Sequence, residues 1–393
     1  MSRGIVWLLA FSTGCVVANI YYVQPLLADV AREFGLSVVQ IGAVAMLGQI
    51  GTGLGMLFFV PLGDKYERRS LISTMILLES VALAFAASAS SVAWLSLACF
   101  AVGAMTATVH VIVPLAAHLA PERERGRIVG TVLSGLLVGI LLARSFSGVV
   151  GALYGWRTVY WFASGLMLVL AVTLRVTLQP SRPGLSLKWT VLMRSIISLA
   201  REHAMLREAA LLACVLFMSF SALWTTLVFL MRTPPYHYGT TATGLFGLLG
   251  ASGAAAAPLV GRMSDRHGSG RPILFALMST LVGYVLLLFF GRRLVGLIAG
   301  IVLIDLGVQS GHVANQSRIY SLVPAARSRF NTFYMVAFFL GGALGSYFGP
   351  LGFNMAGWPG FCAIPIGALE LALAYFVRKN IPSYKEGALR RSK

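Results

Sequence analysis

Charged residues are scarce in this sequence, and acidic residues are the scarcest. Of the 393 residues, only 11% are charged and 13 are Asp or Glu, whereas 58% are hydrophobic. Soluble domains contain roughly 25% charged residues, and a water-soluble fold could not hide this much apolar sequence. The composition therefore excludes an ordinary soluble protein and indicates a membrane protein.

Cysteine is also rare, and several catalytic motifs are missing. Four cysteines, Cys15, Cys99, Cys214 and Cys362, lie far apart inside apolar runs and form no CxxC pair, so we expect packing residues rather than a zinc site or a disulfide framework. The sequence contains no GxxxxGK[ST], GxSxG or HExxH motif. We expect no cofactor, no ATP-driven step and no enzymatic activity.

The formal net charge of +18 raises the question of nucleic-acid binding. A nucleic-acid-binding protein gathers its basic residues on one soluble face or stripe. Here they lie in short gaps between apolar runs, so the charge predicts membrane topology and we expect no nucleic-acid partner.

Twelve apolar runs are long enough to cross a membrane. A helix needs roughly 20 mostly apolar residues to span the hydrocarbon layer. The runs lie near residues 5–30, 38–62, 70–91, 93–119, 127–151, 156–178, 208–231, 240–262, 272–291, 294–317, 330–352 and 357–378. The first run follows a short basic start but continues without a cleavage pattern, so we interpret it as a retained helix rather than a signal peptide.

Basic residues are distributed unequally among the gaps. If the N-terminus is cytoplasmic, the inside segments hold 25 of the 31 Lys and Arg residues, the outside gaps hold 5, and Arg144 lies within a helix. Cytoplasmic loops carry an excess of Lys and Arg. We therefore expect a multi-pass protein of the inner (plasma) membrane, in contact with the lipid bilayer and with both termini in the cytoplasm.

One long polar gap divides the runs into two sets of six. We expect an N-terminal half over residues 1–178, a cytoplasmic linker over 179–207, and a C-terminal half with a short tail over 208–393. The linker opens with helix-breaking residues. Its later part, from Trp189 to Arg201, has the spacing of an amphipathic helix on the membrane surface, with a flexible linker as the alternative.

The second half repeats features of the first at a nearly constant offset. Arg125 and Arg127 correspond to Arg327 and Arg329, Gly139 to Gly341, and the pairs Gly155–Trp156 and Gly357–Trp358 to each other, all at an offset of 202. Such repeats are typical of secondary transporters. Because each half has six helices, their symmetry axis lies along the membrane normal and their interface is the expected place for a central cavity.

Two loops carry a further resemblance. The sequence LGDKYERR after the second run resembles the signature loop of the major facilitator superfamily, and GRMSDRHG, after the eighth run, is similar to the same pattern. Within that superfamily the chain resembles the drug:proton antiporter type, although Glu67 replaces a glycine of the motif and Cys99 stands where that type has an arginine.

The resemblance implies an all-α integral membrane fold with twelve transmembrane helices in two pseudo-symmetric six-helix halves, and a monomer. It also implies a gating role for the loop residues Asp64, Arg68, Arg69, Asp265 and Arg266, whose carboxylates and guanidinium groups can form charge-assisted hydrogen bonds between neighbouring helices. The alternative is that these loops are basic only because they set the topology.

Ionisable side chains at the membrane centre need a partner or a wet cavity. Asp305, Gln309, His312 and Gln316 recur at spacings of four, three and four, which places them on one helical face. In the superfamily that helix can border the cavity. We expect Asp305 to serve in proton coupling or in recognition of a substrate charge, with a buried structural carboxylate as the alternative.

His110 and His312 are separated by 202 residues and so correspond in the two halves. Histidine titrates near neutral pH, which suits a proton relay; a packing role is the alternative. Arg144 can snorkel outward, bind an anionic substrate group, or pair with a carboxylate. Glu79 and Glu370 lie on helices that the superfamily keeps away from its cavity, so we expect structural roles for both.

Polar and aromatic residues of other helices complete the candidate site. Asn19, Tyr22 and Gln24 precede a helix-breaking Pro25, and Gln49 and Trp224 can join them. Amide and aromatic groups suit a partly apolar solute, while helix contacts or an interfacial belt are the alternative.

The sequence as a whole predicts a secondary active transporter. We expect it to move a small organic solute by alternating access, as proton-coupled efflux. The alternatives are proton-coupled import of a polar metabolite and, from a different class, a membrane enzyme or sensor.

Overall fold

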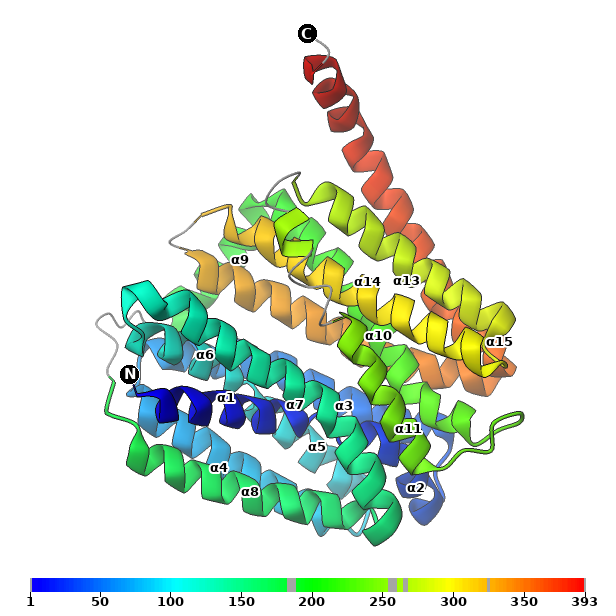
Figure 1. Ribbon diagram of the computed structural model, residues 1–393, viewed down its shortest axis with the longest axis horizontal. Coiled ribbons are helices and arrows are strands. Elements are labelled where there is room, and N and C mark those ends of the chain that lie inside the picture. Colours follow the sequence, from blue (N-terminus) through cyan, green and yellow to red (C-terminus); the bar gives the residue numbers. More distant parts are fainter. Residues whose placement is uncertain (1, 182–188, 254–259, 264–267, 324–325, 392–393) are drawn as a thin grey trace.

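The computed structural model describes residues 2–181, 189–253, 260–263, 268–323 and 326–391, and the regular elements of these residues are all helices (Figure 1). The elements are α1 (Arg3–Ala18), α2 (Val23–Phe34), α3 (Val38–Phe58), η1 (Val60–Asp64), α4 (Arg68–Ala87), α5 (Val92–Thr106), α6 (Val109–Leu119), η2 (Glu122–Glu124), α7 (Arg125–Tyr154), α8 (Trp156–Thr177), α9 (Trp189–Glu202), α10 (Ala204–Met231), α11 (Thr240–Phe246), η3 (Gly247–Gly250), α13 (Gly270–Phe290), α14 (Leu294–Tyr320) and α15 (Arg327–Arg391).

Ten helical stretches within these ranges are long and apolar enough to cross a membrane. The last of them contains two of the predicted runs, because α15 includes a non-helical break at Ala356 and Gly357. The predicted run 240–262 begins with α11 and η3. The structure thus agrees with the predicted order of membrane-crossing segments.

Two of the predicted runs are interrupted, which the sequence analysis did not anticipate. The run 5–30 divides into α1 and α2 around a turn at residues 19–22, and the run 93–119 divides into α5 and α6 around residues 107–108. Each interruption lies within two turns before a proline, Pro25 or Pro114. Proline lacks an amide N–H and clashes with the preceding turn of a helix, so it weakens the helix there.

The two halves use glycine in equivalent helix contacts. A side chain at Gly139 on α7 would collide with Gly14 of α1, and one at Gly341 on α15 would collide with Cys214 of α10. Small residues let membrane helices approach closely. The contact of α1 with α7 in the first half therefore corresponds to that of α10 with α15 in the second.

The same repeat appears in the turns that join the last two helices of each half. Gly155 has φ +85° and Gly357 has φ +59°, a conformation that glycine adopts readily and most other residues do not. Each glycine precedes a buried tryptophan, Trp156 or Trp358. The structure therefore repeats the turn as well as the sequence.

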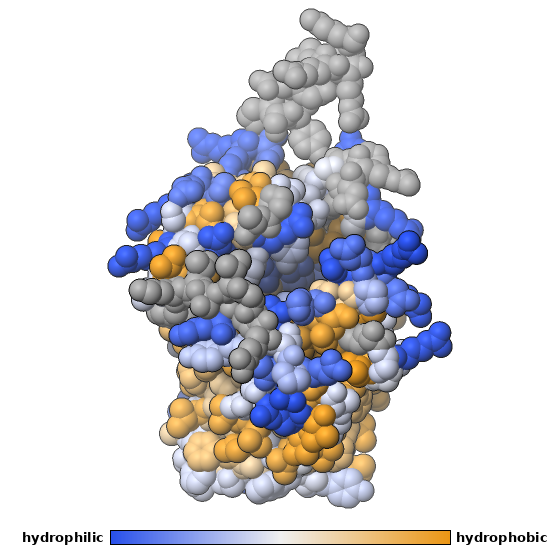
Figure 2. All heavy atoms as spheres, turned by 90° about the vertical axis from the view of Figure 1, so that its left-hand side faces the viewer, coloured by the Kyte–Doolittle hydropathy of each residue, from blue (hydrophilic) through white to orange (hydrophobic). Residues whose placement is uncertain are grey.

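The outer surface and the ends of the molecule differ in character. Leu77 and Val81 on α4 and Val172 and Val176 on α8 are large apolar residues that stay exposed, as expected for side chains that face lipid. Figure 2 views the end that carries the N-terminus, where hydrophilic side chains gather and the face is hollowed near its centre. We call this end the basic end and the opposite one the far end.

The predicted helix in the linker is present as α9. Ile196 of α9 is buried and Arg194 is exposed, so the helix has the apolar and polar sides that its sequence predicts.

Candidate functional site

The two halves meet mainly through three sets of helices. Helix α2 contacts α10 and α11, α7 contacts α11 and η3, and α3 contacts α15. At one close approach, a Cβ atom at Gly148 on α7 would lie 2.8 Å from the Cα of Gly244 on α11. If the two halves move relative to each other, the contacts of the polar residues at this interface must change.

Arg144 lies at this interface and does not snorkel outward. Its residue is 1% exposed, and its Nε donates a hydrogen bond of 2.7 Å to Oε1 of Gln24 on α2. Three aromatic rings surround the guanidinium, with centroids 4.1 Å (Trp224), 4.8 Å (Tyr21) and 5.4 Å (Phe220) from Cζ. A desolvated guanidinium gains about 2 kcal/mol from such cation–π contacts, which helps to hold this charge within the membrane.

Asp305 on α14 belongs to the same cluster. It is 2% exposed, and its Oδ1 accepts a long hydrogen bond of 3.4 Å from Nε1 of Trp224. Its charge interacts with that of Arg144 through space. Nη2 of Arg144 and Oδ2 of Asp305 are buried and have no hydrogen-bond partner within the described part of the chain. A donor and an acceptor, one from each half, are therefore available to a third molecule.

A small cavity lies between these two groups. Its volume is about 20 Å³, which is room for about one water molecule. The lining residues are Leu137, Ile140, Leu141, Arg144, Phe220, Gly250, Asp305 and Gln309. Pockets for small molecules usually measure about 300–1,000 Å³, so the halves must separate here before an organic solute can bind.

The structure brings together four of the predicted site residues: Asp305, Arg144, Gln309 and Trp224. Sequence analysis did not identify Tyr21 and Phe220, which contact Arg144. An aromatic residue in an apolar helix gives no local sign of whether it faces lipid, another helix or a buried arginine.

The two corresponding histidines also approach each other. His110 on α6 is close enough to His312 on α14 for an electrostatic interaction. Nδ1 of His312 lies 3.1 Å from the hydroxyl of Tyr334, and its ring packs on Phe338 with centroids 4.8 Å apart. Both histidines are partly exposed. The pair is separate from the Arg144 cluster, and its role as a proton relay stays a prediction.

Three other predicted residues lie elsewhere. Asn19 donates a hydrogen bond of 2.9 Å to Glu79 within the first half. Tyr22 is buried and packs on Phe146 with ring centroids 5.8 Å apart. Gln49 on α3 is buried with an unpartnered Oε1 and faces α15 near Gly342. Of these, only Gln49 lies between the halves.

An ion pair joins the halves at the far end. Nη2 of Arg232, which follows α10, donates to Oδ1 of Asp29 on α2 at 2.6 Å. Thr240 at the start of α11 donates to the other oxygen of Asp29. Both charged side chains are about a quarter exposed, at 22% and 27%. These contacts, which sequence analysis missed, hold the halves together at the far end.

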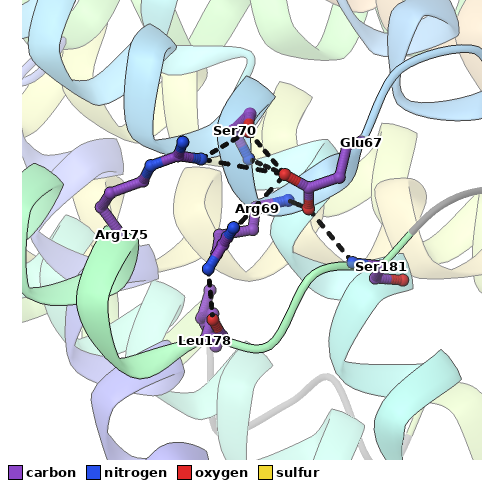
Figure 3. A network of polar contacts seen from close by, with 6 residues as sticks. All are labelled: Glu67, Arg69, Ser70, Arg175, Leu178 and Ser181. Carbon is purple, nitrogen blue, oxygen red and sulfur yellow. Dashed lines mark hydrogen bonds and ion pairs between the residues drawn. The ribbon is translucent and has the colours of Figure 1, made fainter.

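The predicted gating loop forms a network at the basic end (Figure 3). Its centre is Glu67, whose side chain accepts hydrogen bonds from the backbone N–H groups of Arg69, Ser70 and Ser181 and from the hydroxyl of Ser70. Burial raises the pKa of Glu67, but these hydrogen bonds outweigh it and lower the pKa to about 2. Glu67 therefore stays ionised and caps α4.

The arginines of this loop bind backbone carbonyl groups of the first half. Nε of Arg68 donates to the oxygen of Gly63 at 3.1 Å, and Nη1 of Arg69 donates to the oxygen of Leu178 at 3.4 Å. Asp64 ends η1, but its side chain, together with Asp265 and Arg266, lies outside the described residues. Gating by these loops stays a prediction.

Comparison with known proteins agrees with this architecture. The chain matches the Major Facilitator Superfamily over residues 9–294. It is 40% identical to an "Uncharacterized transporter YgaY" of Escherichia coli O157:H7, over 92% of each chain. It is 34% identical to the "Probable transporter SCO4007" of Streptomyces coelicolor, over 91% of this chain and 83% of that one.

Solved structures show the same fold. A bacterial homolog of the human lysosomal transporter Spinster, in an inward-facing and unoccupied conformation, aligns over 96% of this chain and 95% of its own with a TM-score of 0.71 and 16% identity. A point mutant of the nucleoside transporter NupG aligns over 95% of this chain and 98% of its own with a TM-score of 0.77 and 12% identity.

These findings define a multi-pass membrane transporter. The chain belongs to the Major Facilitator Superfamily. The drug:proton antiporter type, which the loop sequences suggested, is a finer assignment that these relatives do not test.

Proposed function

We propose that this chain is a proton-coupled secondary transporter that exports a small organic solute across the inner membrane by alternating access. Residues 1–178 and 208–393 are the two moving halves, joined by the linker 179–207. The observation that carries the proposal is the pair Arg144 and Asp305, one charge from each half. Each has a buried donor or acceptor atom that finds no partner among the residues the structure describes, and both line one small cavity.

The chemistry of this site favours a solute with both a hydrogen-bond acceptor and a donor. An acceptor on the solute, such as a carboxylate, binds Nη2 of Arg144, and a donor, such as an ammonium group, binds Oδ2 of Asp305. The rings of Tyr21, Phe220 and Trp224 offer apolar surface next to both charges. A zwitterionic amino acid with an apolar side chain has this combination of groups.

The arrangement of the halves supports an inward-facing state. The end in Figure 2 carries the N-terminus, gathers hydrophilic side chains and is hollowed. With the N-terminus in the cytoplasm, the inside segments hold 25 of the 31 Lys and Arg residues, which favours the cytoplasm for that end. The far end is closed by Asp29, Arg232 and the contact of Gly148 with Gly244. Entry of one proton across 100 mV supplies ~2.3 kcal/mol, which is enough to drive export of a neutral solute.

The test is solute-driven proton movement in proteoliposomes that contain a pH-sensitive dye. A lipophilic cation, a sugar and leucine are compared on the wild type, on Asp305→Asn and on Glu370→Gln. Glu370 is exposed on α15 and provides the matched carboxyl-to-amide control. Leucine-dependent proton flux in the wild type and in Glu370→Gln, but not in Asp305→Asn, supports the proposal.

Two other results would count against it. Flux that Asp305→Asn leaves unchanged places the solute site elsewhere. Proton and solute movement in the same direction supports import, the alternative function, instead of export.

A further inference from the structure

A second carboxyl group is buried in the membrane-spanning region, inside the first half. Glu79 on α4 is 0% exposed. Its Oε1 accepts hydrogen bonds from Nδ2 of Asn19 at 2.9 Å and from Oγ1 of Thr106 at 3.1 Å. Asn19 opens the turn between α1 and α2, and Thr106 is the last residue of α5. Glu79 thus lies beside both interrupted helices of this half.

The groups that face Glu79 are neutral. Cys15 on α1 and Tyr22 after it are close enough for electrostatic interaction. On the other neighbouring helices, Tyr160 of α8 and Cys99 of α5 hydrogen-bond to each other, and His110 of α6 faces His312. Arg175 of α8 pairs with Glu67 at the end of α4. In the described part of the chain, none of the ion pairs found involves Glu79.

A carboxylate buried without a cation is strongly destabilised, and such a group takes up a proton instead. Two acceptor atoms of this hydrogen-bonded pair, Oε2 of Glu79 and Oδ1 of Asn19, are buried and have no partner among the described residues. A proton on Oε2 removes the charge and converts one of these acceptors into a donor. The arrangement of this conformation therefore suits the protonated form of Glu79.

The turn between α1 and α2 links Glu79 to the interface between the halves. Asn19 at its start binds Glu79. Tyr21, within it, packs on the guanidinium of Arg144, and Gln24, just after it, accepts a hydrogen bond from the same group. Residues 19–24 form one short segment. A change at Glu79 that moves Asn19 therefore also moves Tyr21 and Gln24 and alters their contacts with Arg144.

We propose that Glu79 is the proton-carrying residue of the transport cycle and that the turn at residues 19–22 transmits its protonation state to Arg144. This inference rests on the proposed function and assigns the proton and the solute to different sites. The far-end-closed conformation holds Glu79 as a carboxylic acid. When the solute binds, the O–H bond of the Glu79 carboxyl group breaks and an O–H bond forms on a water molecule, which carries the proton away at the basic end as H3O⁺ and leaves Glu79 as a carboxylate.

The first experiment reads the proton directly and needs no solute. Infrared spectra of the purified wild-type protein at neutral pH are compared with those of Glu79→Gln and of Glu370→Gln. We expect a carboxylic-acid C=O band that is absent in Glu79→Gln and present in the control. Glutamine keeps the size of the side chain and can still accept from Asn19 and Thr106. If the band of the wild type is unchanged in Glu79→Gln, the proposal is wrong.

The second experiment reads the conformation. Spin labels are placed at the far end by Tyr154→Cys on α7 and Val295→Cys on α14, which are 71% and 79% exposed. In the wild type, raising the pH should increase the fraction of molecules in which the two spin labels are far apart. Above the pKa of the titrating group, the ratio of long-distance to short-distance molecules should rise by up to about tenfold per pH unit. In Glu79→Gln the short distance should persist at every pH, whereas Glu370→Gln should follow the wild type.

The outcomes separate this inference from the proposed function. A pH response that persists in Glu79→Gln but disappears in His110→Gln assigns the proton to the histidine pair and overturns the inference. An absent response in the wild type overturns it as well. Both results leave the solute site testable by the flux assay with Asp305→Asn, and a failure of that assay leaves the infrared result valid.

Discussion

The two carboxyl groups in the middle of the molecule, Asp305 and Glu79, are buried to the same degree but have different surroundings. Asp305 lies between the halves and faces the guanidinium of Arg144, whereas Glu79 lies within one half and faces an amide and a hydroxyl. A cation can keep a buried carboxylate charged, whereas neutral donors offset only part of the desolvation that favours its protonation. Under the function proposed above, the charge on the partner, rather than burial, distinguishes the solute site from the proton site.

The largest expected effect comes from removing the positive charge of Arg144. Arg144→Met leaves Asp305 buried without a positive charge, which should cost about 3–5 kcal/mol of stability. The double variant Arg144→Met with Asp305→Asn should recover part of that loss, because the uncompensated charge is gone. Thermal unfolding in detergent measures both. Equal stability of the single and double variants would show that the two charges do not interact.

A smaller effect is expected where the halves touch without charges. Gly148→Ala places a Cβ atom 2.8 Å from Cα of Gly244 and 2.9 Å from the oxygen of Thr240, and overpacking of this kind costs about 1–3 kcal/mol. The far end should open, shifting the population by about tenfold. The distance between spin labels at Tyr154→Cys and Val295→Cys measures this opening of the far end. Gly130→Ala, which meets nothing within 4 Å, is the control and should leave that distance unchanged.

Loss of the ion pair at the far end should have a smaller effect than Arg144→Met or Gly148→Ala. Asp29→Asn removes the partner of Arg232, and an exposed pair contributes about 0.2–1 kcal/mol. The same label distance should lengthen by less than in Gly148→Ala. Because salt screens exposed charges, high ionic strength should produce a similar shift in the wild type and little further change in Asp29→Asn. Salt-independence of the wild type would argue against this contact as a closing element.

Glu67 extends the comparison to a carboxylate outside the membrane and should have the smallest effect on the distance between the halves, because its contacts lie within the first half and the segment that follows it. The pKa of Glu67 is lowered from 4.5 to about 2 in the folded protein. Its stabilising contribution is therefore complete above about pH 4.5 and is lost as the pH falls toward 2. Amide hydrogen exchange at Ser70 and Ser181 should stay protected at neutral pH in the wild type. It should be faster in Glu67→Gln at the same pH, with amides of α8 as the internal reference.

Several residues of the candidate site were predictable from the sequence, but the different surroundings of Asp305 and Glu79 were not. The spacing of Asp305 and Gln309 predicted a shared face, and both residues line the cavity. Arg144 was recognised as unusual, with three roles left open, and the structure excludes snorkelling because the residue is buried. Asn19 was placed with the solute site, whereas its hydrogen bond goes to Glu79, 60 residues away. Helical periodicity specifies a face but does not specify which helix covers it.

The sequence by itself determined the twelve apolar runs, the repeat at an offset of 202 and the superfamily, because hydropathy, charge and glycine positions are local properties of the chain. The tertiary structure was needed to show that Tyr21, Phe220 and Trp224 surround Arg144 and that, among the described residues, no cation lies beside Glu79. These contacts join helices far apart in sequence. Their partners depend on how close the glycines allow the helices to approach and on where the prolines interrupt them.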